Sequence, residues 1–392
     1  MVLKGLKLRI YPNKEQREFF EKQFGCGRFV YNSLLNERQE FYRKTKSLKN
    51  FKYTTEKQLK QKFVWLKDVD AVSLQQSRMD LDKAYNNFFR KIKSKQKTSL
   101  KFKSKKGTQS YRTIRIEIDS KNKKIKLPKL DWIKYSDNRT PEGKIKSATI
   151  SKTKTGKYFV SLLLEINKEI VPTKISKDCR AIGLDMSLPN MFHSSENEIA
   201  NYPKFYKHSE KRIKLLSKRL SRKTKGSRNR EKARVKLAMT HEKVVNRRKD
   251  FQHKLSTKIV DQSDIIGVET LDLQRMAQRF GKSISEIGWA NFVSMLEYKC
   301  LWKGKHLVFA DKKYASSKIC NSCGYKNVEL TLEEREWDCP ICKSHNHRDY
   351  NAALNLKDNA IVCTEEYSGS YASGDLVRQK NSVMDLTAEI VE

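Results

Sequence analysis

The sequence predicts an α/β protein of two or three folded units: an N-terminal β-domain interrupted by a helical insertion, then an α/β core interrupted by a cysteine-rich module. Three observations predict this organisation. Alternating apolar and polar residues flank a stretch of helical periodicity, two apolar runs end in single acids, and two Cys-x-x-Cys pairs lie in the C-terminal third. The 392 residues, 38% of them hydrophobic, can bury at least one sizeable core.

The β-domain is predicted by alternation on both sides of the insertion. The opening stretch alternates apolar and charged side chains up to Pro12, as a half-buried strand does. The same alternation returns from about Tyr111 onward, including the run from Thr113 to Ile118, and indicates further strands of a barrel or sheet. Because the opening strand has no nearer partner, we assign residues 1–13 and 107–178 to one β-barrel domain.

Residues 14–106 form the predicted helical insertion. Helical periodicity runs from Lys14 to about Tyr42 and again from about Ala71 to Lys91, before a basic loop that ends at Lys106. One face of the second helix carries apolar residues at helical spacing and is predicted to be buried. The other face carries polar side chains that either pair with base edges in a DNA groove or are merely solvated. These side chains are Gln75, Gln76, Arg78 and Lys83.

The chain carries positive charge along most of its length. Lys and Arg number 83 and Asp and Glu 45, which gives a net charge of +38. We expect nucleic acid to match this charge, bound largely through release of condensed counterions. No apolar run approaches the roughly 18 residues that a membrane span needs, and the opening residues show no signal-peptide pattern, so no membrane partner is expected. A merely soluble basic protein is the alternative.

A basic helical hairpin is predicted over residues 204–260. Between Lys204 and Lys249 there are 19 Lys or Arg against three Glu, on a helical background that breaks around Lys225-Gly226-Ser227. Such a run repels itself unless phosphate is bound, which favours a nucleic-acid channel over a solvated charged face.

The cysteines predict a metal module. Two Cys-x-x-Cys pairs are separated by fifteen residues, which is the spacing of a structural zinc ribbon, and the gap is long enough for a hairpin. The pairs are Cys320 with Cys323 and Cys339 with Cys342. A thiol redox role is the alternative. The other four cysteines are scattered, which argues against a disulfide framework and for an intracellular, reducing compartment.

Three acids stand where acids are out of place. Asp185 and Glu269 each follow an apolar run that reads as a buried strand, and Asp349 lies where a helix should begin. Alone, Asp349 is read as an N-cap. Together, the three carboxylates suit two Mg²⁺ ions that hydrolyse a phosphodiester, and strand, strand and helix carrying them in this order are expected of an RNase H-like nuclease core.

These residues resemble the TnpB family, nucleases encoded by certain bacterial and archaeal insertion sequences and related to the type V CRISPR effectors. The resemblance extends from near residue 1 to about residue 357. Its motifs are Arg9-Ile10-Tyr11-Pro12, Gly25-Cys26-Gly27-Arg28-Phe29-Val30-Tyr31-Asn32, Gly183-Leu184-Asp185, Gly267-Val268-Glu269, the stretch Tyr314 to Gly324, Cys339-Pro340-Ile341-Cys342 and Arg348-Asp349-Tyr350-Asn351-Ala352-Ala353.

The resemblance implies a RuvC-type, RNase H-like core over residues 179–313 and 345–362, with a zinc ribbon inserted at 314–344. It makes the β-barrel a wedge domain and the helical insertion a recognition domain. Residues 363–392 match nothing in the family, and their composition predicts a flexible tail.

The resemblance also implies a mechanism. Members bind a guide RNA transcribed from the end of the element, recognise a short motif beside the target, open the duplex by RNA pairing and cut it. Carried over, Asp185, Glu269 and Asp349 hold two Mg²⁺ ions, and the four paired cysteines hold one structural Zn²⁺. Further nucleic-acid contacts are expected at Arg112, Arg222, Lys223, Arg247, Arg248 and Arg348.

The implied partners are the guide RNA and double-stranded target DNA, in the cytoplasm of a prokaryote and associated with the nucleoid when bound to DNA. No Gly-rich phosphate loop indicates a nucleotide cofactor. Three other functions remain open: a nuclease-inactive RNA-guided DNA-binding repressor, a strand-transfer transposase that works without RNA, and a plain zinc-ribbon nucleic-acid-binding protein.

Overall fold

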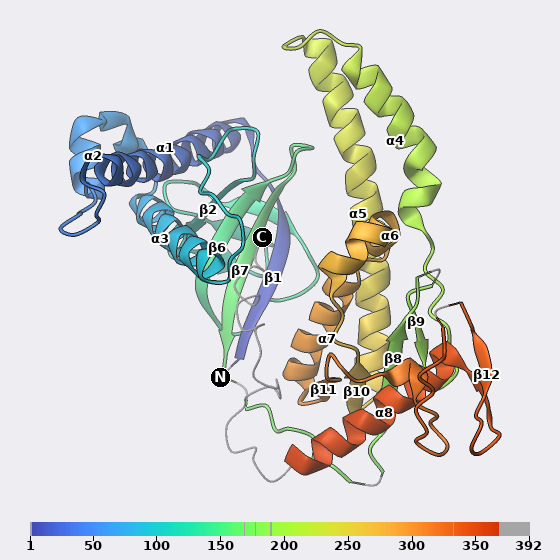
Figure 1. Cartoon of the computed structure of the whole chain (residues 1–392). Coiled ribbons are helices and arrows are strands. Elements are labelled where there is room, and N and C mark those ends of the chain that lie inside the picture. Colours follow the sequence, from blue (N-terminus) through green and yellow to red (C-terminus); the bar gives the residue numbers. More distant parts are fainter. Residues whose placement is uncertain (1, 168, 177, 189, 332, 368–392) are drawn as a thin grey trace. The chain divides into compact units, whose positions relative to one another are not determined.

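The computed structural model describes residues 2–167, 169–176, 178–188, 190–331 and 333–367 (Figure 1). The chain forms two compact units that divide after Glu169, earlier than the predicted domain boundary after residue 178. The reason is the packing of the intervening segment. The backbone N–H of Thr173 donates to Gly304 O (2.8 Å), and the carbonyl of Thr173 lies 2.9 Å from His306 Nε2, so this segment belongs with the second unit.

The first unit contains an antiparallel sheet of seven strands in the order β2-β6-β7-β1-β5-β4-β3. The opening strand β1 pairs with β7 and with β5, so it joins the later strands as the alternation predicts. The strands are β1 (Val2–Tyr11), β2 (Gln109–Thr113), β3 (Glu117–Asp119), β4 (Lys124–Lys126), β5 (Ile133–Ser136), β6 (Lys144–Lys152) and β7 (Tyr158–Ile166).

The predicted barrel is wrong in one respect, because the described strands form an open, curled sheet whose two edge strands, β2 and β3, do not pair with each other. The alternating run from Thr113 to Ile118 is divided between these two edges. The chain leaves the sheet at Ile114, which is 53% exposed. The alternation of apolar and polar residues continues between β2 and β3, so it does not reveal where one strand ends and the next begins.

The helices of the first unit are two long ones with a short helical stretch between them. Asn13 caps α1 in a reciprocal capping box with Gln16, and Asp70 caps α3. The intervening α2 and η1 were not predicted from the sequence because each is only one or two turns long. The bounds are α1 (Lys14–Thr45), α2 (Glu56–Lys62), η1 (Val64–Asp68) and α3 (Ala71–Lys93).

The second unit is built on a four-stranded sheet in the order β11-β10-β8-β9, in which β8, β10 and β11 are parallel and β9 is antiparallel. The strands are β8 (Ala181–Met186), β9 (Phe192–Ser194), β10 (Ile265–Val268) and β11 (His306–Phe309). The helices are α4 (Phe205–Ser221), α5 (Arg228–Gln262), α6 (Leu273–Ile287), α7 (Trp289–Lys303) and α8 (Arg348–Tyr367). The cysteine-rich module contributes η2 (Ser316–Lys318), β12 (Glu336–Asp338) and β13 (His345–His347).

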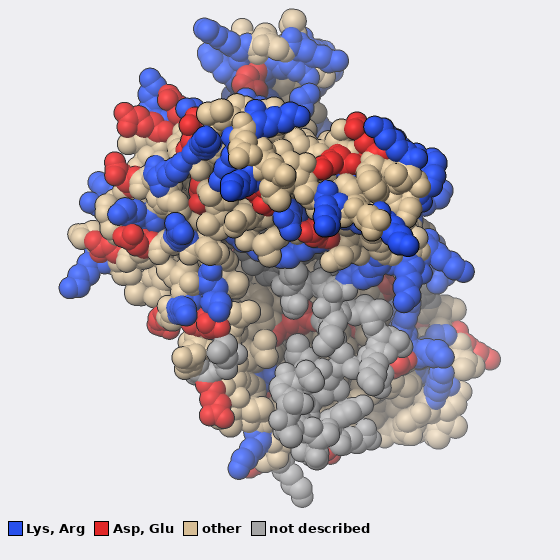
Figure 2. Space-filling view, turned by 90° about the vertical axis from the view of Figure 1, so that its left-hand side faces the viewer, with Lys and Arg blue, Asp and Glu red and all other residues tan. Residues whose placement is uncertain are grey.

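The basic hairpin is present as two packed helices, α4 and α5, which extend away from the sheet of the second unit (Figure 1). The break falls between Ser221 and Arg228, where Gly226 adopts a positive φ of 89°. Lys and Arg are prominent on both sides of the hairpin end at the top of Figure 2, and acidic residues are interspersed with Lys and Arg over the visible face.

Helix α8 packs against β8 and β10 at two glycines. Gly183 and Gly267 are paired in register on these strands, and a Cβ atom at either position would overlap a backbone carbonyl of α8, that of Ala353 or that of Leu356. Glycine at both positions therefore allows the helix backbone to approach the sheet closely.

Helix α8 also corrects the predicted tail. It continues to Tyr367, so residues 363–367 belong to the helix, while the remainder of the predicted tail lies outside the described residues. Among the described helices, none is both long enough and apolar enough to cross a membrane.

We predict that Gly183→Ala destabilises the second unit, because its methyl group must displace the backbone of α8. The expected loss in the free energy of unfolding is at or above the upper end of the roughly 1–3 kcal/mol typical of overpacked cores. Urea denaturation measures it. Gly281→Ala in α6 is the control, since nothing lies within 4 Å of the added Cβ, and it should be neutral or stabilise by up to about 1 kcal/mol. Equal stabilities of the two variants would contradict the packing argument.

Candidate active site and metal centre

Two of the three predicted acids lie at the same edge of the second sheet. Asp185 is in β8 and is 8% exposed, and Glu269 directly follows β10. The parallel pairing of Leu184 with Val268 immediately precedes both acids. Because the carboxyl ends of parallel strands meet at one edge, the sheet brings these two carboxylates together.

Asp349 joins them from the first turn of α8 and is 9% exposed. Its predicted alternative role as an N-cap is wrong. His347, just before the helix, takes that role, because its Nδ1 accepts the backbone N–H of Tyr350 (3.4 Å). The carboxylate of Asp349 instead accepts two hydrogen bonds from Arg335 Nη1 (3.0 and 3.2 Å) and lies 3.6 Å from His193 Nε2.

Three side chains that the sequence did not single out hold the acids. Ser316 Oγ donates to Glu269 Oε1 (2.6 Å), Arg335 binds Asp349, and His193 faces Asp349 from β9, where it pairs with Asp185. Ser316 lies inside the quoted Tyr314 to Gly324 motif, so that signal was available. Arg335 and His193 occur in no spacing pattern that could have revealed them.

The electrostatics of the cluster disfavour negative charge. Burial raises the pKa of Asp185 well above its usual range, and the charges of Glu269 and Asp349 raise it further, while Arg348 and Arg335 oppose the shift. Burial also raises the pKa of Glu269, against the hydrogen bond from Ser316. Three carboxylates held this close therefore fit a site that receives positive charge.

The three acids form a looser group than the cysteines. Among the described residues, only the four paired cysteines form a group of three or more potential metal ligands whose ligand atoms all lie within 4.8 Å of one another. The acids are nevertheless close enough for the charges of Glu269 and Asp349 to raise the pKa of Asp185.

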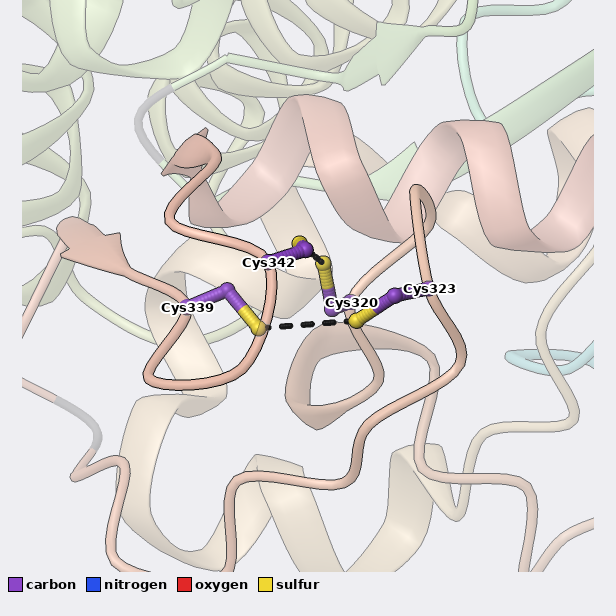
Figure 3. Close-up of side chains that lie close together, drawn as sticks. All are labelled: Cys320, Cys323, Cys339 and Cys342. Atoms are coloured by element: carbon purple, nitrogen blue, oxygen red, sulfur yellow. Dashed lines mark hydrogen bonds between the residues drawn. The ribbon is translucent and has the colours of Figure 1, made fainter.

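The four predicted cysteines come together in one cluster (Figure 3). Cys320 Sγ lies 3.7 Å from Cys342 Sγ, and Cys323 Sγ lies 3.6 Å from Cys339 Sγ. These separations exclude disulfides and approach the roughly 3.8 Å that separates sulfurs in a tetrahedron with Zn–S bonds of about 2.3 Å. The cluster could therefore bind zinc.

Hydrogen bonds favour the thiolate form at two of the four cysteines, Cys320 and Cys342, whereas contacts with the other cysteines raise the pKa of Cys323 to about 12. Burial acts against the charge of Cys320, but hydrogen bonds from Ser344 Oγ and from the backbone N–H groups of Cys323 and Ser322 lower its pKa to about 6. Ser344 also lowers the pKa of Cys342. The hairpin is displaced from the gap where the sequence predicts it: β12 precedes the second cysteine pair and β13 follows it, so the paired strands enclose Cys339 and Cys342.

A network of amide side chains joins this module to α8. Asn351 Oδ1 accepts the backbone N–H of Asn321 (2.9 Å), and Asn355 Nδ2 donates to Ser316 O (2.8 Å) and Ile319 O (2.7 Å). Since Ser316 holds Glu269 and α8 carries Asp349, the cysteine module and the acids share one hydrogen-bonded framework.

The predicted nucleic-acid contacts of the first unit lie on α3 and β2. Gln75 and Lys83 are exposed, and Arg78 Nη1 lies 3.8 Å from Glu56 Oε1. Gln76 and Arg112 line one small hollow. These roles stay predictions.

In the second unit, Arg222, Lys223 and Arg247 are exposed on the basic hairpin. The other two predicted contacts are engaged within the chain: Arg248 donates to the carbonyl of Glu286 (3.2 Å) and Arg348 to that of Thr331 (3.1 Å). These roles also stay predictions.

Three family profiles match parts of the chain. A family described as a probable transposase matches residues 161–279, a Cas12f1-like TNB domain matches residues 289–356, and a helix-turn-helix domain matches residues 1–47. In the structure, this last segment contains β1 and a single long helix, α1, and its described residues form no helix-turn-helix.

Similar proteins and a solved structure extend the match to nearly the whole chain. A "Putative RNA-guided DNA endonuclease" of Streptomyces pristinaespiralis is 35% identical over 91% of this chain and 89% of its own length. The "Putative RNA-guided DNA endonuclease InsQ" of Escherichia coli K12 is 29% identical over 90% of this chain and 91% of its own. A cryo-EM structure of a Cas12f1-sgRNA-target DNA complex shares the fold, with a TM-score of 0.55 at 15% identity, and the match covers 91% of this chain and 98% of that one. The chain therefore belongs to the TnpB family.

Proposed function

We propose that this protein is an RNA-guided DNA endonuclease of a transposable element, which cuts target DNA beside a short flanking motif by two-metal-ion phosphodiester hydrolysis. One observation carries the proposal: Asp185, Glu269 and Asp349, from three distant parts of the sequence, meet at one edge of the second sheet. Two relatives that match this chain over about nine-tenths of their own length are named as putative RNA-guided DNA endonucleases, which supports a reaction guided by RNA.

The second unit acts as an RNase H-like, RuvC-type core in this proposal. Support comes from the mixed sheet with three parallel strands, from acids at the carboxyl ends of two of them, and from a third acid on a helix that packs across the sheet. The curled sheet of the first unit would be the wedge domain, with α1 to α3 as the recognition helices.

The donor set of the acids fits magnesium. Three carboxylates and no thiolate make a hard, oxygen-ligated site, and the raised pKa values of Asp185 and Glu269 indicate charge that a cation would relieve. Bound Mg²⁺ would supply Lewis acidity and lower the pKa of a water for attack on the phosphodiester. The sheet edge and α8 fix the three carboxylates, while Ser316 and Arg335 orient two of them.

Arg335 has a second use in the proposed reaction. The side chain of Arg335 is 59% exposed while its Nη1 binds Asp349, so it reaches solvent beside the acids. A planar guanidinium binds phosphate oxygens through paired hydrogen bonds, so Arg335 is placed to hold the phosphate of the strand to be cut.

The four cysteines would hold one structural zinc ion. The hydrophobic core of the module is small, with Leu330 and Trp337 buried beside two cysteines. Such a small core rarely stabilises a fold without a disulfide or a structural metal ion. Zinc would supply that stabilisation and close a coordination sphere that has no open position for catalysis.

Guide RNA and target DNA would occupy the basic surfaces. The hairpin of α4 and α5 carries much of the net charge of +38, and the polar face of α3 offers groups that read base edges. Target choice would then reside in base pairing, with the protein reading only a short duplex motif.

The three alternative functions differ in what purified protein does. A nuclease-inactive repressor binds target DNA with RNA but does not cut it, a strand-transfer transposase joins DNA ends without RNA, and a plain binding protein shows no divalent-dependent activity. Sequencing the copurifying RNA and assaying cleavage of matching DNA with Mg²⁺ distinguishes all of them from the proposed nuclease.

We predict that Asp185→Ala abolishes cleavage of matched DNA and leaves RNA binding unchanged. The loss should exceed the roughly 10–100-fold seen when only an outer partner of a metal ligand is removed. Gel analysis of DNA cut by the RNA-loaded protein in Mg²⁺ provides the measurement. Glu196→Ala, a change at an exposed acid in the turn after β9, is the control and should cut normally. Full cleavage by Asp185→Ala would refute the metal assignment.

We predict that Asp185→Asn raises the Tm of the magnesium-free protein at pH 7.5. The pKa of Asp185 is raised in the fold, so its ionised form destabilises the folded state, and this destabilisation is relieved as pH falls through the raised pKa. The gain should be about 2–4 °C for each kcal/mol relieved, and should shrink at low pH or with added Mg²⁺. A lower Tm for Asp185→Asn at pH 7.5 would show that the carboxylate stabilises the fold by itself.

We predict one zinc ion per chain in protein purified under reducing conditions, lost in Cys320→Ser. The variant should unfold at lower temperature and cleave poorly, since Ser316 and Asn355 link the module to the acids. Plasma mass spectrometry measures the zinc. Cys363→Ser, outside the cluster, should keep the metal. Zinc-free wild-type protein that folds and cuts normally would overturn the assignment.

A further inference from the structure

A hollow of about 540 Å³ lies on the basic hairpin of the second unit, where the start of α4 faces the C-terminal half of α5. Its size falls in the range of small-ligand sites. Its lining combines two aromatic rings and a leucine with three cations and one acid. The residues are Phe205, Arg247, Asp250, Phe251, Lys254, Leu255 and Lys258.

Helical periodicity builds this lining as two parallel rows on α5. One row contains Arg247, Phe251 and Leu255, each four residues from the last, and the adjacent row contains Asp250, Lys254 and Lys258 at the same spacing. Residues four apart on a helix lie on one face, so a row with two apolar residues and a fully charged row face the hollow together.

The aromatic rings form its floor. The ring centroids of Phe205 and Phe251 are 6.3 Å apart with their planes at 70°, so each offers its own face, and Tyr202 packs edge-on against both from the core side. Tyr202 is 6% exposed, whereas Phe205 and Phe251 are half-buried. Tyr202 thus fixes the positions of Phe205 and Phe251, and these two rings keep part of their surface open to the hollow.

The side chains around the hollow carry more positive than negative charge, which favours binding of an anion. No described carboxylate forms an ion pair with Arg247, while Lys254 Nζ lies 2.8 Å from Asp250 Oδ2 and Lys258 Nζ lies 3.3 Å from Glu198 Oε2. Both pairs are largely exposed, and exposed pairs of this kind contribute little, so the lysines can exchange partners for phosphate.

An unstacked nucleotide of a single strand matches this combination of groups. A base stacks on an aromatic floor, and the phosphates on either side meet the cationic rim. Duplex nucleic acid does not fit, because its bases are already stacked on each other. The acid favours RNA, since Asp250 can accept a hydrogen bond from a ribose 2′-hydroxyl, which DNA lacks, but would repel a phosphate.

We propose that this hollow binds one unstacked nucleotide of an RNA strand, with its base stacked on Phe251 and touching the edge of Phe205, and with its phosphates on Arg247, Lys254 and Lys258. The proposal rests on the proposed function in that RNA is the bound partner. It goes further by naming the place and the mode of binding.

Ultraviolet crosslinking of the purified protein with its copurifying RNA tests the contact directly, because a base stacked on an aromatic ring forms covalent adducts with it. We expect mass spectrometry to find nucleotide adducts on peptides that contain Phe205 or Phe251. RNA adducts confined to other peptides would overturn the proposal.

Affinity provides the second readout, with short oligouridylate as the probe. Phe251→Leu keeps an apolar side chain but removes the stacking surface, and should weaken binding roughly 5- to 150-fold, while Phe251→Tyr retains affinity. Phe280→Leu is the matched control, because Phe280 is an aromatic residue of α6 that is 44% exposed and lies outside the hollow. Equal affinities for Phe251→Leu and wild type would contradict stacking.

Three further outcomes separate the possible failures. Oligodeoxythymidylate that binds and crosslinks at the hollow as strongly as oligouridylate would overturn the assignment to RNA. If RNA copurifies and guides cleavage while the hollow yields no adducts, only this inference fails. If no RNA copurifies and cleavage is absent, the proposed function fails as well.

Discussion

The close approach of α8 to the sheet of the second unit is the constraint on which the candidate active site depends. Gly183 and Gly267 lie side by side on β8 and β10, two residues before Asp185 and Glu269, and the backbone of α8 occupies the space where their side chains would be. Larger residues would push the helix outward and carry Asp349 away from the other acids. The short Gly-x-acid pattern on each strand therefore encodes both the helix contact and the carboxylate that follows it.

A second constraint follows from the charge that this packing concentrates. Three acids at one sheet edge repel each other and lose solvation, and the chain offsets this with Ser316 and Arg335, both from the segment between β11 and α8. The same segment carries the four cysteines, and its amide links to α8 pass through Asn351 and Asn355. The module that would bind zinc is thus part of the support of the acids, although its own ligands take no part in the proposed chemistry.

Much of this could be predicted from the sequence because the signals are local. Asp185 and Glu269 stand out as acids at the ends of apolar runs, the cysteines are recognised by their spacing, and the break in the basic hairpin coincides with a glycine. Arg335 and His193 could not be found this way, because their importance arises only when distant segments fold against Asp349. Alternation of apolar and polar residues shows which side chains face the core, but it does not show whether the two edge strands of a sheet pair with each other. An open sheet therefore cannot be distinguished from a closed barrel by this pattern.

Anomalous diffraction from crystals of the RNA-loaded protein grown with Mn²⁺ in place of Mg²⁺ tests the proposed metal site most directly. We expect two manganese peaks among the carboxylates of Asp185, Glu269 and Asp349, besides a zinc peak at the four cysteines. Crystals that show these carboxylates well ordered but without manganese, or with manganese only elsewhere, would contradict the proposed site.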